Sequence, residues 1–138
     1  MTAETKLDMK KVMILFQRRY NFIREIDRLT GELADAMDRS DEVSVSMVLQ
    51  MRADEMAKFD DCTNDIWQMS RGDKDNLRKI RTLVQSDPEK NTGESPEEKK
   101  IYEIRRKTQA VIDQVRVVDE RLNRRAAGKE SFYGSEVR

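Results

Sequence analysis

The side chains that most often perform chemistry in proteins are scarce in this sequence, and one type is missing. The chain has no histidine and a single cysteine, Cys62. Zinc sites with His and Cys ligands, Ser-His and Cys-His nucleophile pairs, and the Glu-x-x-His motif of di-iron bundles all require an imidazole. The sequence therefore excludes these sites, and the lone cysteine excludes an intrachain disulfide.

Carboxylates are the remaining candidates for a metal site, and the densest group lies between residues 54 and 65. Only Asp61 and Asp65 are four residues apart on one helix face, so the group spreads around a helix and does not converge on one pocket. The five glycines are isolated from one another, which excludes a glycine-rich phosphate-binding loop. We therefore expect no enzyme activity, no metal and no cofactor.

The composition is typical of long amphipathic helices. Among the 138 residues, 39% are charged and 6% aromatic, with only 2 prolines and 5 glycines. The 27 basic and 27 acidic residues cancel, which argues against binding to nucleic acid or to an anionic membrane surface. No apolar run approaches the ~20 residues that span a bilayer, and the N-terminus lacks a signal-peptide core. We expect a cytoplasmic protein without membrane insertion.

Two long helices are predicted in the first half of the chain. Apolar residues recur at spacings of three and four from about residue 5 to residue 38. The alternation Val43-Ser44-Val45-Ser46 could begin a strand, but three consecutive apolar residues at 47–49 break it. The later spacing is helical, and Ser40 and Asp41 can cap a helix that runs to about Ser70. Its apolar arc spans roughly 200°, so this helix must contact more than one neighbour.

The second half predicts a short helix from about residue 73 to residue 86, then a polar loop without an apolar anchor, which we expect to be mobile. Ser95-Pro96-Glu97-Glu98 is a strong helix-start signal, with a capping serine and proline at the first helical position. A heptad seam follows and should end at Gly128. Its members are Ile101, Ile104, Thr108, Val111, Val115, Val118 and Leu122.

These elements predict an all-α fold without a sheet, an elongated antiparallel bundle of three long helices and one short helix. Residues 1–128 should form a single domain. Residues 129–138 have no helical periodicity, and we expect a flexible C-terminal tail that carries Phe132 and Tyr133.

The predicted first hairpin resembles that of the flagellar type III export chaperones, most closely the FlgN type and more loosely the FliT type. The resemblance covers about residues 7–70. It rests on Leu33-Ala34-Asp35-Ala36-Met37, Ser40-Asp41, Val45, Val48-Leu49, Arg52, Met56 and Phe59. It implies a cytoplasmic chaperone that keeps a flagellar hook-associated (hook-filament junction) protein unassembled and delivers it to a component of the export apparatus.

The resemblance also implies that the C-terminal region contacts the client protein. The corresponding contact residues here are Val111, Val115, Val118, Leu122, Phe132 and Tyr133. Met47, Met51 and Met69 flank the apolar arc of the second helix, and the flexible thioether side chain suits an imperfectly matched partner. The alternative interpretation is that the seam residues and the methionines are ordinary core.

Two other functions are compatible with the pattern. A structural homodimer or adaptor could form through the seam from Ile101 to Leu122. A nucleic-acid binder could use the lysines and arginines of residues 99–125, but these alternate with acidic residues around the helix, which is typical of a solvated face.

Overall fold

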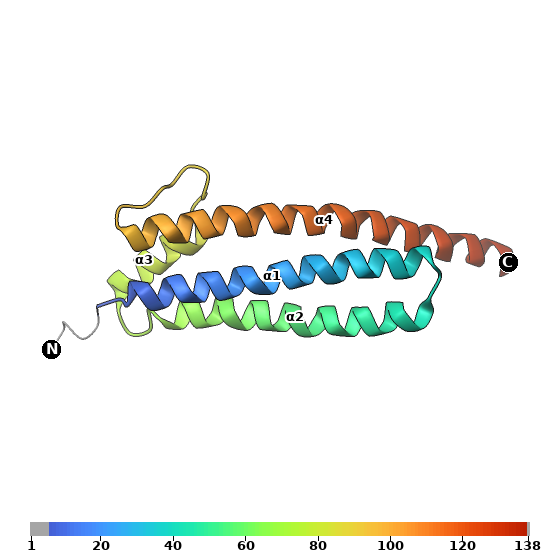
Figure 1. Ribbon diagram of the computed structural model, residues 1–138, viewed down its shortest axis with the longest axis horizontal. Coiled ribbons are helices and arrows are strands. Elements are labelled where there is room, and N and C mark those ends of the chain that lie inside the picture. Colours follow the sequence, from blue (N-terminus) through green and yellow to red (C-terminus); the bar gives the residue numbers. More distant parts are fainter. Residues whose placement is uncertain (1–5, 138) are drawn as a thin grey trace.

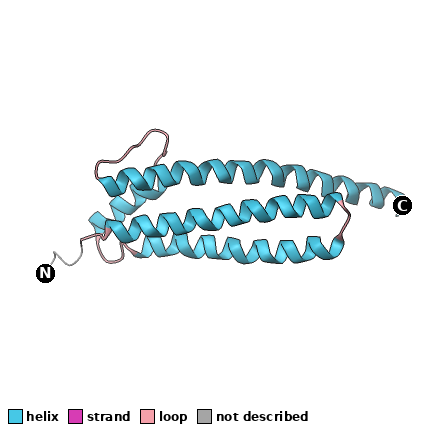
Figure 2. Ribbon diagram, in the orientation of Figure 1, coloured by secondary structure: helices cyan, strands magenta, loops and turns pink. Residues whose placement is uncertain are grey.

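The structure is built from helices connected by two tight turns and one longer loop (Figures 1 and 2). The computed structural model describes residues 6–137, with side-chain surroundings for residues 6–128. In chain order the helices are α1 (Met9–Asp38), α2 (Glu42–Gln68), α3 (Lys74–Gln85) and α4 (Pro96–Val137). Within residues 6–137 there is no strand, so the predicted all-α class is confirmed. None of these helices has the length and apolarity required to cross a membrane.

Short polar side chains define where the helices begin. The Asp41 carboxylate accepts a hydrogen bond from the Ser44 amide at 3.1 Å, and the Ser95 hydroxyl accepts one from the Glu98 amide at 3.1 Å. Such bonds satisfy amides that have no carbonyl partner in the first turn. The Val43-Ser44-Val45-Ser46 alternation is therefore the first turn of a helix, as its sequence context predicts.

Helix α1 lies between the other two long helices (Figure 1). The Cys62 thiol of α2 donates to the Leu15 carbonyl near the start of α1, whereas Val48 of α2 packs with Leu33 near its end. These contacts make α2 antiparallel to α1. On the other side, α4 runs parallel to α1, from Ile101 in the Val12 cluster to an ion pair between Arg125 and Asp38. Helices α2 and α4 approach one another at few places.

The core follows α1 from one end to the other in three clusters. At the α3 end, all four helices contribute side chains to the first cluster. Its members are Val12, Leu15, Phe16, Cys62, Ile66, Ile80, Leu83, Ile101, Tyr102 and Ile104. The middle cluster is Ile23, Ile26 and Val115, and the cluster at the far end is Leu29, Leu33, Val48 and Leu122. Because α3 is only 12 residues long, it covers only the first of these clusters.

Helix α4 does not end at Gly128, where the sequence predicted its end, but runs on to Val137. A single glycine costs only about 1 kcal/mol inside a helix, and no proline follows it to stop the helix. The last turns of α4 extend past the turn between α1 and α2 (Figure 1). The side chains of residues 129–138 lie outside the described residues, so the predicted flexibility of this segment stays a prediction.

The loop between α3 and α4 has polar anchors that an apolar pattern does not reveal. The Arg106 guanidinium donates to the carbonyls of Pro88 at 3.0 Å and Asn91 at 3.3 Å. Arg105 donates to the Ser86 carbonyl at 2.6 Å, at the C-terminus of α3. Two residues assigned to a solvated face from sequence therefore hold this connection against α4.

Packing of α3 on the first cluster can be tested with two substitutions on the same helix. Ile80 is completely buried, whereas Leu77 is 37% exposed. We expect Ile80→Ala to lower the free energy of unfolding by about 2–5 kcal/mol, because it leaves a cavity between α3 and the long helices. Leu77→Ala should cost less than about 1 kcal/mol. Urea denaturation followed by circular dichroism measures both, and equal losses would contradict this assignment of the core.

Candidate partner-binding groove

An apolar groove of about 330 Å³ runs between α2 and α4, over the middle of α1. Its lining residues are Ile23 and Ile26 from α1, Met56, Phe59 and Asp60 from α2, and Ile112, Val115, Arg116 and Asp119 from α4. The floor is the middle core cluster, while Met56 stands at the rim and is 42% exposed. The groove therefore offers apolar side chains on three helices, with charged groups along its edges.

The groove lies in line with α3. Arg105, which contacts the end of α3, is seven residues before Ile112, and Ile112 is seven residues before Asp119, so all three share one face of α4. Helix α3 thus occupies the position between α2 and α4 at one end of the molecule, and no described residue occupies that position further along. The shortness of α3 is what opens the groove.

Arg19 of α1 lies at the end of the groove nearest α3. Its Nε donates to Thr63 Oγ1 at 2.8 Å, and its guanidinium carbon lies 4.4 Å from the centre of the Phe59 ring. Burial lowers the pKa of Arg19, and the neighbouring positive charge of Arg105 lowers it further. Among the described residues, no carboxylate forms an ion pair with Arg19, although Asp60 is close enough to oppose these effects.

A charge pair between α2 and α4 bounds the other end. Arg52 donates to Asp119 Oδ2 at 2.7 Å, and the two side chains are 10% and 30% exposed. The Nε atom of Arg52 is buried and has no hydrogen-bond partner among the described residues. Removal of one member of such a pair leaves a poorly solvated charge, so this link should hold α2 and α4 at a defined separation.

The structure places the predicted α4 contact residues mainly in the core. Val115 and Leu122 are each 6% exposed, and the half-buried Val111 and Val118 pack on the middle and far clusters. Of the four, only Val115 also lines the groove. A partner can reach the other three only along their exposed edges, and a homodimer through this seam would have to displace α1.

The predicted methionines lie apart from one another. Met47 and Met51 are 60% and 45% exposed, and neither lines the groove. Met69 is half-buried against the cluster at the α3 end. Phe132 and Tyr133 lie outside the residues whose side chains the structure describes.

Met56 and Ile112 line the groove but are not among the partner contacts predicted from the sequence, although both lie in predicted helices. The wide apolar arc of α2 was the available signal, because an arc broader than one contact requires a second surface. Its direction could not be read from one helix alone. Which flank of the arc faces α4 depends on where α4 packs.

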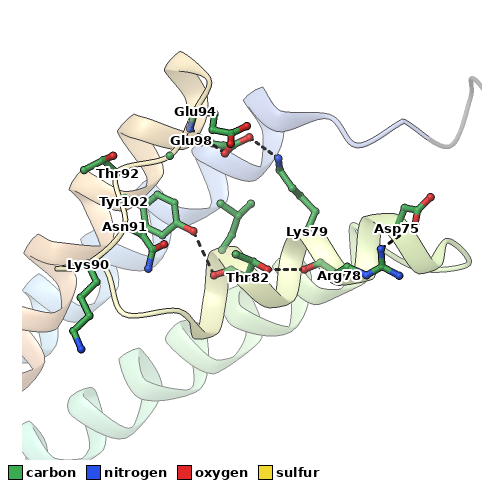
Figure 3. A pocket seen from close by; sticks show the side chains of 12 residues that line it. Asp75, Arg78, Lys79, Thr82, Lys90, Asn91, Thr92, Glu94, Glu98 and Tyr102 are labelled. Atoms are coloured by element: carbon green, nitrogen blue, oxygen red, sulfur yellow. Dashed lines mark hydrogen bonds and ion pairs between the residues drawn. The ribbon is translucent and has the colours of Figure 1, made fainter.

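A second cavity, of about 530 Å³, lies between α3, the α3–α4 loop and the start of α4 (Figure 3). Lys79 Nζ and Glu98 Oε2 are 2.6 Å apart across it, and the other Glu98 oxygen accepts from the Glu94 amide at 3.3 Å. Gly93 has a φ of +78°, and a Cβ there would lie 2.7 Å from the Glu98 backbone. These contacts join α3 to the start of α4, so we interpret this cavity as part of a structural joint.

Cys62 and the acidic residues near it show no arrangement suited to chemistry. Burial raises the pKa of the Cys62 thiol, which disfavours the reactive thiolate. Asp61 and Asp65 are exposed, and among the side chains described for residues 6–128 no three acidic or cysteine side chains gather as metal ligands would.

Comparison with known proteins adds no relative. No protein-family model, no curated protein and no solved structure matches the chain.

The joint between α3 and α4 should be sensitive to acid. Burial alone would raise the pKa of Glu98, but Lys79, the Glu94 amide and Ser95 together lower it below the usual value. A lowered folded-state pKa contributes stability above the unfolded-state value of ~4.3, and this is lost as the pH falls through the folded-state pKa. We expect Glu98→Gln to cost about 1 kcal/mol at pH 6 and distinctly less at pH 3, measured by urea denaturation at each pH.

The control is Glu97→Gln in the same helical turn, because Glu97 forms no ion pair with a described residue. The free energy of unfolding of this variant should fall with decreasing pH as it does in the unaltered protein. An equal cost of Glu98→Gln at both pH values would show that the Lys79–Glu98 pair does not stabilise the fold.

Proposed function

We propose that the protein is a chaperone that binds an amphipathic helix of another polypeptide in the groove between α2 and α4. The observation that carries this proposal is the apolar groove in line with α3, where the bundle has room for a fourth helix along its middle. An apolar groove between helices is a common site for helix-in-groove recognition. The groove has no arrangement of residues that would support a reaction, so binding is the function that its geometry favours.

The exposed rim of the groove provides the binding energy in this proposal. Met56 is 42% exposed. Burying apolar surface contributes about 25 cal/mol per Å², so covering this side chain would favour binding. Methionine also adapts to different partner side chains.

The client class comes from the family resemblance. We propose that the chain acts in the cytoplasm as an elongated antiparallel bundle of the flagellar export chaperone type. Its client would be a flagellar hook-associated protein, held unassembled and passed to a component of the export apparatus. A client of this kind exposes amphipathic helices before assembly, and the groove is suited to cover such a helix.

A homodimeric scaffold is the second candidate. The observation in its favour is a stripe of Val43, Met47 and Met51, spaced by four residues along the outer edge of α2, which are 72%, 60% and 45% exposed. Light scattering of the purified chain separates the two candidates, since a scaffold must be dimeric without a client. The expected result for the chaperone is a monomer that forms a one-to-one complex.

Two methionines on opposite edges of α2 provide a matched test of the groove. We expect Met56→Glu to weaken binding of the hook-associated protein of the source organism by at least about tenfold, because it buries a charge in the interface. Met47→Glu introduces the same charge outside the groove and should leave the affinity within about twofold. Isothermal titration calorimetry with purified proteins measures both.

Both substituted positions are exposed, so neither variant should alter the thermal unfolding midpoint by more than a few degrees. If Met47→Glu weakened binding more than Met56→Glu, the result would instead place the interface on the outer stripe of Val43, Met47 and Met51. Absence of binding by the unaltered chain to any hook-associated protein would remove this client class.

The end of α4 is tested by a chain that stops at Gly128. If residues 129–138 contact the client, the shortened chain should bind it at least about fivefold more weakly, while its unfolding midpoint stays unchanged. Unchanged affinity would confine the client to the groove.

A further inference from the structure

Two arginines at the α3 end of the groove carry an inference about the partner, and it rests on the proposed function. Arg19 projects from α1 and Arg105 from α4, and the positive charge of Arg105 is close enough to affect Arg19. Arg105 also contacts the C-terminus of α3. Within the described chain neither forms an ion pair, although Asp60 and Asp87 exert an opposing field. This end of the groove therefore has two arginines that form no direct ion pair with a described carboxylate.

The hydrogen bonds of Arg105 and Arg19 differ. Arg105 donates to the Ser86 carbonyl at 2.6 Å and so serves the C-terminus of α3. Arg19 has only its Nε occupied, by Thr63 Oγ1 at 2.8 Å. Its two terminal nitrogens bond to no described residue, and neither is fully buried. These nitrogens form the edge of a guanidinium that can bind a carboxylate through two parallel hydrogen bonds.

The geometry of the Arg19 side chain favours a fixed position. Its stacking on Phe59 at 4.4 Å and its bond to Thr63 hold the guanidinium beside a ring that lines the groove. Arg19 and Arg105 are half-buried, and this burial lowers the pKa of both. A partly desolvated, oriented cation gains more from an acidic partner than an exposed lysine would.

The dimensions of the vacant position fit a short helix. The α4 residues that line the groove run from Ile112 to Asp119, a rise of roughly 10 Å at ~1.5 Å per residue. An occupying helix of about two to three turns would contact Ile112 and Met56 along its length. Its end would lie beside Arg19.

We infer that the groove binds an amphipathic helix whose apolar stripe is followed, at the end nearest α3, by an Asp or Glu that pairs with Arg19. The carboxylate completes the hydrogen bonding of Arg19 and neutralises the positive end of the groove. The partner is thus specified by an apolar stripe together with an acidic residue at its end.

The test uses three synthetic helical peptides of roughly 18 residues, long enough to span the groove. All three are acetylated and amidated and have the same leucine stripe on an alanine and glutamine background. They differ only at two positions, one beside each end of the stripe, which hold Glu, Gln or Lys, so either orientation presents the residue to Arg19. Fluorescence anisotropy measures their affinities for the full chain.

The expected order of affinity is Glu, then Gln, then Lys, with the Glu peptide about tenfold tighter than the Gln peptide. Arg19→Gln should abolish the difference between Glu and Gln, and Arg19→Glu should favour the Lys peptide. Arg19→Lys keeps the charge and should keep part of the preference. Arg18→Gln removes the adjacent, exposed arginine and should change nothing.

Circular dichroism of each variant separates a lost contact from a lost fold. Equal affinity of the unaltered chain for all three peptides would overturn the acidic pairing, and sensitivity of that binding to Met56→Glu would leave the groove proposal intact. No binding of any peptide would overturn both. A dimer of the chain alone that Met56→Glu converts to a monomer would assign the groove to a second copy and overturn the inference.

Discussion

Burial of α1 between α2 and α4 is the constraint on which the rest of the structure depends. One helix forms the centre of all three core clusters, and its two long neighbours pack on it more than on each other. In a symmetric four-helix bundle each helix has two neighbours of similar length. Here the fourth helix is 12 residues long against 30 and 27 for α1 and α2, so the bundle is complete at one end only.

The groove follows from that incompleteness. Where α3 ends, the floor provided by Ile23 and Ile26 remains, and α2 and α4 form its walls. The Arg52–Asp119 pair spans the walls, and the Nε of Arg52 has no hydrogen-bond partner among the described residues. Charged residues at both ends and apolar residues between them are the arrangement that a short amphipathic helix complements. The shortness of α3 thus leaves open a groove that a helix from another polypeptide could occupy.

Arginines account for much of what the pattern of apolar residues could not show. Arg105 and Arg106 hold the α3–α4 connection through backbone carbonyls, and Arg19 lies between α1 and α2. On a helical wheel these charged residues look like a solvated surface. In the fold, however, a long arginine side chain can bury its stem and direct its charge toward a distant acceptor. The acceptors are carbonyls and a hydroxyl from other segments, which no local pattern identifies.

The sequence by itself determined the helices, because periodicity, capping residues and turn residues act over a few positions. Asp41 and Ser95 begin their helices as predicted, and the seam residues Val115 and Leu122 face inward. Only the tertiary structure decided that Met56 lines a groove while Met47 lies outside it. Both occupy the same wide apolar arc, and the difference depends on where α4 packs on α1, an interaction between residues far apart in the chain. The continuation of α4 past Gly128 shows the opposite limit, since one glycine is too weak a signal to end a helix.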